Sequence, residues 1–267
     1  MINHNEFCSG TRQAINLTSR LQKGGALLSD MRQIVGLWSE TMAQSDPVPV
    51  LSRALPKATI ARVKDTYTRA FRPRFIQGNP PESWRFARVL EDKNANIEIV
   101  LPFYYWITAR AEPVLYGFVT EVVYARVRTA DTSIRIDEAI TWLNHQLIRS
   151  GKSWTPTVVK KVARGLLATL RDFKILEGAT HKKIAVTHLG PQAFALVAFC
   201  LYETGSTGRD LVRHPDWRVF LLAEAEVERL FMDCHQHGWL KFEAAGDLRR
   251  TEFPSATFKE YAHVVLG

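Results

Sequence analysis

The sequence has few cysteines and no long apolar run. Cys8, Cys200 and Cys234 are the only cysteines in 267 residues, which argues against a disulfide-rich secreted domain and favours a reducing compartment. The longest uninterrupted apolar segment, residues 193–202, is half the length of about twenty residues that a membrane helix needs. Residues 1–20 lack the apolar core of a signal peptide. We therefore expect a cytoplasmic protein with no membrane partner.

The sequence also lacks the usual motifs of catalytic and metal sites. Residues 205–209, Gly-Ser-Thr-Gly-Arg, have neither the spacing nor the lysine of a phosphate-binding loop. The only metal-like cluster, residues 234–237 (Cys-His-Gln-His), has no second pair of ligands, and we interpret it as a helix C-terminus. His214 and Asp216 resemble an acid–base pair, but no nucleophile motif is near, and a structural turn is the favoured interpretation. We expect no enzyme activity, no cofactor, no metal and no small-molecule substrate.

Acidic residues are scarce in two segments of a basic chain. The whole sequence has a net charge of +8, with 46% hydrophobic residues that can form a proper core. Residues 149–183 carry nine basic and two acidic side chains, and residues 53–74 carry seven and one. The remainder of the chain is therefore net acidic, at −5. Such concentration of positive charge indicates a polyanionic partner rather than a particular fold.

Apolar spacing predicts helices in the N-terminal half. Steps of three and four predict one helix over residues 24–42 and a basic helix over 59–71, with Thr59 as its N-cap. Residues 97–127 are rich in aromatic side chains and predict two packed helices, in which residues 103–106 belong to the core rather than to a base-stacking surface. These helices form a bundle.

The second half adds short strands to the helices. We expect a helix capped by Asp137, a turn, a helix from N-cap Thr155 to Phe173, and a strand over residues 182–186. This order is that of a winged helix-turn-helix. Near the end, a helix over residues 224–237 precedes a hairpin, 239–243 and 248–253, and residues 193–202 form a buried helix.

The predicted fold class is mainly α: an N-terminal helical bundle followed by winged helix-turn-helix-like units with short β-hairpins. The expected units are a flexible tail (1–20), the bundle (21–130), a winged helix-turn-helix-like unit (131–190) and a C-terminal helical unit with a β-hairpin (191–267).

The helix after Thr155 is predicted to present a basic face. At 100° per residue, four cations fall within about 80° of one another, opposite an apolar face. The cations are Lys160, Arg164, Arg171 and Lys174, and the apolar residues are Val158, Val162, Leu166, Leu170 and Phe173. A stripe of this kind can neutralise the phosphates of a duplex. The competing interpretation is an ordinary solvated helix face.

We predict nucleic-acid contacts through ten basic residues. They are Lys152, Lys160, Lys161, Arg164, Arg171, Lys174, Lys182 and Lys183, with Arg62 and Arg69 in the second basic segment. For Arg62 and Arg69, pairing with acidic neighbours is an equally open interpretation. Little sequence specificity is expected, because the stripe lacks the Asn or Gln that would read adenine.

Five segments together resemble a known family. They are residues 23–28 (KGGALL), 105–126 (YWITARAEPVLYGFVTEVVYAR), 171–178 (RDFKILEG), 214–222 (HPDWRVFLL) and 234–246 (CHQHGWLKFEAAG). In this order and at this chain length the sequence resembles the BrxA family, small proteins of the bacteriophage exclusion (BREX) systems, over residues 23–262.

The resemblance implies a helical, non-enzymatic protein that binds double-stranded DNA as an accessory component of phage defence, beside other BREX subunits. It supplies no catalytic residues. The alternative is an assembly scaffold whose basic faces dock acidic partner proteins, with incidental affinity for DNA. The sequence leaves open the choice between DNA and RNA and the oligomeric state.

Overall fold

Helices dominate the molecule, as the apolar spacing predicts. The structure is a computed structural model that describes residues 16–23, 25–56, 59–186 and 189–267. One cluster of buried apolar residues extends from Leu17 to Val265 and joins all parts of these ranges. Within the same ranges, no helix combines the length and the hydropathy that crossing a bilayer requires.

The N-terminal half is a bundle of short helices around one apolar helix. In chain order the elements are η1 (Arg20–Lys23), α1 (Leu28–Leu37), α2 (Glu40–Ala43), α3 (Val48–Ala54), α4 (Ile60–Thr66), η2 (Tyr67–Ile76), α5 (Trp84–Asp92), α6 (Ile97–Ala111), α7 (Pro113–Phe118), η3 (Val119–Val123) and α8 (Tyr124–Arg126). Helix α6 is central: residues 103–106 are at most 1% exposed, which confirms their assignment to the core.

The single helix predicted over residues 24–42 is wrong. Helix α1 ends at Leu37, and buried Trp38 is extended, with φ −65° and ψ 136°. The Ser39 hydroxyl then accepts a hydrogen bond from the Met42 amide at 3.3 Å and begins α2. A serine that satisfies the free amides of a new helix competes with continuation of the old one.

The basic helix predicted from Thr59 is confirmed and longer than expected. The Thr59 hydroxyl accepts from the Arg62 amide at 3.3 Å, as an N-cap should. Helix α4 then continues without a break into η2, a wider π-helical segment that ends at Ile76. The predicted pair of helices within residues 97–127 is also present as α6 and α7, with Pro113 in the first turn of α7.

The middle of the chain combines two helices with a small sheet. The elements are β1 (Ser133–Ile134), α9 (Ile136–Ser150), α10 (Pro156–Asp172), β2 (Leu176–Glu177) and β3 (Lys182–Ile184). The sheet is antiparallel in the order β1-β3-β2. The Thr155 hydroxyl accepts from the Val158 amide at 3.4 Å, which confirms the predicted start of α10.

The predicted cap of α9 is wrong by two residues. The N-cap is Arg135, whose amide donates to the Glu138 carboxylate at 2.8 Å, and Asp137 lies in the first turn. An acidic residue there still suits the positive end of the helix dipole. The predicted strand over residues 182–186 is shorter in the structure and ends at Ile184.

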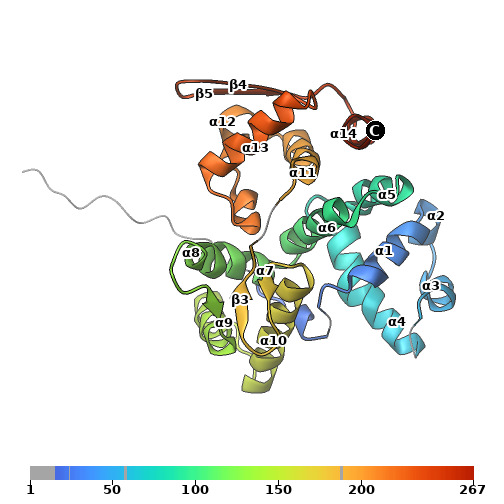
Figure 1. The fold of residues 1–267 in the computed structure, drawn as a ribbon. Coiled ribbons are helices and arrows are strands. Elements are labelled where there is room, and N and C mark those ends of the chain that lie inside the picture. The colour runs from blue at the N-terminus through green and yellow to red at the C-terminus, as the bar shows by residue number, and fades with distance from the viewer. Residues whose placement is uncertain (1–15, 24, 57–58, 187–188) are drawn as a thin grey trace, which may run out of the picture.

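The C-terminal part packs helices against a hairpin. Its elements are α11 (Pro191–Glu203), α12 (Gly208–Val212), η4 (Pro215–Phe220), α13 (Glu224–Gln236), β4 (Lys241–Ala245), β5 (Leu248–Glu252) and α14 (Phe258–Leu266). The buried helix, the helix before Gly238 and the hairpin are present as predicted, although the first strand of the hairpin begins and ends two residues later than predicted. Helix α14 was not predicted; it packs on α11 and α5 and so ties this part to the bundle (Figure 1).

Helix η1 connects the bundle to the middle unit, because it contacts both α10 and η2. The approach to α10 is close: a Cβ atom on Gly165 would lie 1.9 Å from the Leu21 carbonyl oxygen. Only a glycine leaves room for the backbone there. Gly165 therefore fixes the position of η1 against α10.

Candidate nucleic-acid interface

The outer face of α10 carries free positive charge. Lys160, Lys161 and Arg164 are exposed, and across the described ranges no carboxylate forms an ion pair with any of them. On the opposite side of the helix Val162 and Leu166 are fully buried. Burial of one face fixes the orientation of the other, so the three side chains point to solvent.

Two members of the predicted stripe differ from the prediction. Helix α10 ends at Asp172, and Lys174 follows in a left-handed conformation with φ 62°, so placing Lys174 on the helix face is wrong. The Arg171 guanidinium lies 3.0 Å from the Asp172 carboxylate, with both side chains exposed. Pairs of this kind contribute little to stability, so Arg171 remains available to another anion. The predicted apolar Val158 is half-buried, and its neighbour Val159 is the buried residue.

The three lysines that flank α10 are in different situations. Lys152 is exposed but held, since its Nζ donates to the Asn16 side chain and to the Leu17 carbonyl oxygen, each at 3.0 Å. On β3, Lys182 donates to the Ala179 carbonyl oxygen at 2.6 Å, whereas Lys183 is exposed. Of the tail predicted over residues 1–20, residues 1–15 lie outside the described ranges, and Leu17 is buried.

Arg62 and Arg69 lie away from α10, on α4 and η2. Arg69 Nε donates to Asp65 at 3.0 Å, so the alternative of acidic neighbours holds for this residue. Arg62 is exposed, and no other described side chain pairs with it. Arg74, which also contributes to the basic segment, is buried and donates to Glu112 at 3.1 Å. The segment is therefore not one continuous stripe.

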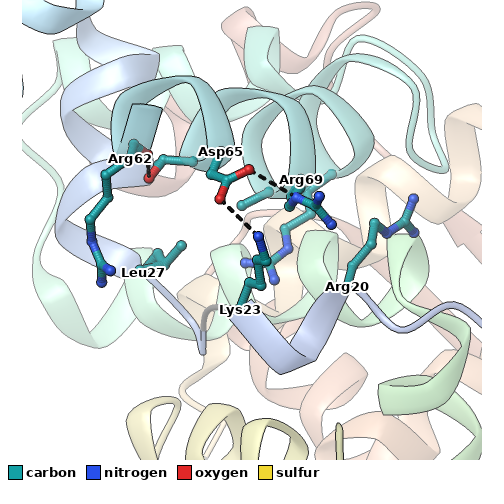
Figure 2. A pocket seen from close by; sticks show the side chains of 9 residues that line it. Arg20, Lys23, Leu27, Arg62, Asp65 and Arg69 are labelled. Atoms are coloured by element: carbon teal, nitrogen blue, oxygen red, sulfur yellow. Dashed lines mark hydrogen bonds and ion pairs between the residues drawn. The ribbon is translucent and has the colours of Figure 1, made fainter. Parts of the chain in front are cut away.

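A cavity that the sequence did not reveal brings Arg62 and Arg69 together with residues far away in the chain. Arg20 and Lys23 of η1 line it from one side (Figure 2). The buried Arg74 is also a lining residue. Arg20 and Lys23 are separated from Arg62 by about forty residues. The only hint in the sequence is the composition of η1, in which two of four residues are basic.

The buried Asp216 is a structural carboxylate. It accepts hydrogen bonds from Trp106 Nε1 at 2.7 Å, from Arg110 Nη1 at 2.8 Å and from the Tyr116 hydroxyl at 3.0 Å. His214 Nδ1 accepts from the Asp216 amide at 3.2 Å, and burial lowers the pKa of His214 below 6.5 although the Asp216 charge opposes this. This carboxylate joins α6 and α7 to η4, as the structural interpretation of the motif predicts.

The Cys-His-Gln-His cluster (residues 234–237) lies at the C-terminal end of helix α13. Cys234 is buried, and burial raises the pKa of its thiol to about 12. His237 Nδ1 lies 2.8 Å from the Asp233 carbonyl oxygen, and its ring stacks on Trp239. Throughout the described ranges, no group of three or more His, Cys, Asp or Glu side chains has the geometry of a metal site.

Comparison with known families decides the assignment of the chain. The family model described as BrxA matches residues 16–199, which is more than two thirds of the sequence and includes α10 and the cavity. The chain belongs to the BrxA family. Membership makes it a BREX-associated protein. A search of curated proteins gives no significant match.

Two solved structures share the fold of this BrxA-family chain. An uncharacterised protein from Magnetospirillum magneticum has a TM-score of 0.55 at 12% identity, covering 76% of this chain and 97% of its own. A magnesium ion-bound SspB structure has a TM-score of 0.57 at 13% identity, covering 94% of this chain and 87% of its own. At such identities the likeness concerns the fold alone.

Proposed function

We propose that this BrxA-family protein is a non-enzymatic, double-stranded DNA-binding accessory protein of a BREX phage-defence system. The observation that carries the proposal is the outer face of α10, where Lys160, Lys161 and Arg164 are exposed and have no carboxylate partner in the part of the chain that the structure describes. Exposed lysines and arginines without carboxylate partners bind backbone phosphates and release the counterions of those phosphates. Contacts of this kind carry little sequence information.

The arrangement around α10 supports the same proposal. The order β1-α9-α10-β2-β3 and the sheet order β1-β3-β2 resemble those of a winged helix-turn-helix, and in that interpretation α10 is the helix that would face the duplex. The turn between β2 and β3 would then be the wing, and Lys183 follows it on β3. In this arrangement the cations of α10 and of the wing contact one stretch of phosphates.

The test is charge reversal on α10. The triple variant Lys160→Glu, Lys161→Glu, Arg164→Glu should bind unrelated DNA duplexes about tenfold more weakly or worse, because it removes phosphate contacts and adds repulsion. A plot of log affinity against log salt concentration should flatten by about two to three units, since each lost phosphate contact removes about 0.9. Gel shifts at several salt concentrations measure both effects.

A matched control separates the site from the total charge. Arg229→Glu, Lys241→Glu, Lys259→Glu changes three exposed cations of α13, β4 and α14 that have no ion pair among the described residues. Both triple variants lower the net charge from +8 to +2. If the two variants lose the same affinity, or if the α10 variant loses none, α10 is not the interface.

The scaffold alternative is favoured by a different feature of the same unit. Ile148 on α9 and Val186 after β3 are 81% and 101% exposed, as apolar residues at protein interfaces often are. Co-purification with other BREX subunits that survives nuclease treatment, together with weak duplex binding by the isolated protein, would favour the scaffold. Parallel gel shifts with duplex RNA and with single strands determine which kind of nucleic acid the protein binds.

A further inference from the structure

The cavity between η1 and the α4–η2 helix is lined mainly by cations. Its volume is about 330 Å³. Five of its nine lining residues are basic, and only Leu27 and Ala70 are apolar. The basic residues are Arg20, Lys23, Arg62, Arg69 and Arg74. A small polar anion fits this lining better than a large apolar ligand does.

The charges around the cavity do not balance. Asp65 is shared between Lys23, at 3.2 Å, and Arg69, at 3.0 Å. Glu112 is likewise shared between Arg20 and Arg74. Each carboxylate thus serves two cations, and Arg62 has none among the described residues, so a net charge of +3 remains.

The inner wall of the cavity is held in place. Arg74 is 1% exposed; its Nε donates to Glu112 and its Nη1 to the carbonyl oxygens of Gly25 and Ala26, both at 3.2 Å. Arg20 donates to Glu112 and to the Ala111 carbonyl oxygen. Among the described residues, Arg74 Nη2 and Arg20 Nη1 have no acceptor. Fixed guanidinium groups with free N–H bonds match the geometry of phosphate oxygens.

The outer wall contains a carboxylate that a ligand can replace. Figure 2 shows the side chains of Lys23 and Arg69 converging on Asp65 beside Arg20, with Arg62 on the other side of Asp65. The hydrogen bond from Arg69, and then that from Lys23, lowers the pKa of Asp65, which therefore stays charged at neutral pH. All three groups are 45–49% exposed, so they can turn toward a stronger acceptor.

From this geometry we infer that the cavity is a binding site for a phosphate group. Arg20, Lys23, Arg69 and Arg74 surround the anion, and Asp65 competes with it for two of these cations, Lys23 and Arg69. The site is distinct from the α10 face, and its existence does not depend on the proposed DNA contacts there.

The test uses sodium pyrophosphate as the probe, with the full-length protein. Calorimetric titration and the rise in Tm should both report binding. The variant Lys23→Ala, Arg69→Ala should weaken the affinity about tenfold or more, because it removes two charge-assisted donors. Asp65→Asn should instead tighten the affinity severalfold, because the competing charge is gone. A purely structural role for these residues does not predict opposite signs.

The matched control is Lys64→Ala. Lys64 is an exposed cation of α4, the helix that carries Asp65, and it does not line the cavity. It should leave the affinity for pyrophosphate unchanged. Absence of binding by the wild type in both measurements overturns the inference. So does a Lys23→Ala, Arg69→Ala variant that keeps its circular dichroism spectrum and its wild-type affinity, or an Asp65→Asn variant that binds more weakly.

Two sources of the phosphate give different results with DNA. A free phosphorylated molecule predicts that Lys23→Ala, Arg69→Ala leaves duplex affinity intact while pyrophosphate binding falls. A backbone phosphate of the duplex predicts that both fall and that pyrophosphate competes with duplex. The α10 triple variant should retain pyrophosphate binding, so failure of the proposed DNA interface and failure of the phosphate site are distinguishable.

Discussion

At the scale of single residues, burial decides which charges matter for stability. Glu112 is fully buried and accepts from Arg74 and Arg20, whereas Asp65 pairs with Lys23 and Arg69 at the surface. Both carboxylates have two cationic partners, but only Glu112 compensates a guanidinium that is itself buried, that of Arg74. The two residues therefore form a natural comparison.

We expect Glu112→Gln to lower the free energy of unfolding by about 3 kcal/mol or more, because it leaves the Arg74 charge buried without a counter-ion. Asp65→Asn should change the same free energy by less than about 1 kcal/mol, as exposed pairs do. Urea denaturation of both variants measures the difference. Equal losses in the two variants would contradict the importance of burial.

Residue by residue, the sequence predicted exposure better than pairing. Helical spacing correctly placed Lys160 and Arg164 on the outside, because the apolar residues of α10 determine which face is buried. It could not predict that Arg74 is buried. The carboxylate that compensates this buried charge is that of Glu112, which is distant in the chain and lies between α6 and α7. The position of Lys174 was missed because α10 ends at Asp172, two residues before Lys174.

At the scale of elements, the close contact between η1 and α10 gives a prediction about glycine. A methyl group at Gly165 would meet the Leu21 carbonyl oxygen at 1.9 Å. We expect Gly165→Ala to lower the free energy of unfolding by about 1–3 kcal/mol, because the backbone of η1 must move away. Thermal or urea denaturation measures the loss.

The control for this substitution is Gly36→Ala in α1. Gly36 is exposed, and a Cβ atom there meets nothing within 4 Å. Alanine should therefore stabilise that helix by up to about 1 kcal/mol through its higher helix propensity. If Gly165→Ala is also neutral or stabilising, η1 does not pack on α10 as described.

Several element boundaries were predicted from residues that start or stop a helix. Thr59, Thr155 and Gly238 each sit at the predicted helix end, because their local chemistry suffices to start or stop a helix. The break at Trp38 and the helix α14 were missed. Both α2 and α14 begin at a cap that the prediction did not use: the Ser39 hydroxyl accepts from the Met42 amide, and the Thr257 hydroxyl accepts from the Glu260 amide.

At the scale of the whole molecule, the continuous core predicts cooperative unfolding. The buried cluster runs from Leu17 to Val265 without a division between the bundle, the middle unit and the C-terminal part. We expect one urea transition, with tryptophan fluorescence and far-UV circular dichroism coinciding. More than one transition would show that the predicted units 21–130, 131–190 and 191–267 do not all unfold together.

The overall class and the family were accessible from the sequence, whereas the cavity was not. Periodicity and five short segments were enough for a mainly helical BrxA-family protein. The cavity requires Arg20 and Lys23 to meet Arg69, and this meeting follows from the tertiary position of η1. Position in the sequence alone therefore assigns the basic residues of this site to separate regions of the chain, near the predicted tail and in the helix that begins after Thr59.

The pitch of η1 has a consequence of its own. Because a 3₁₀ turn contains three residues, Arg20 and Lys23 stand directly above one another, while Leu21 points elsewhere and is buried. In an α-helical turn the same two side chains would be rotated apart by about 60°. The tighter winding of four residues is thus what aligns two like charges, against their mutual repulsion, along a single line.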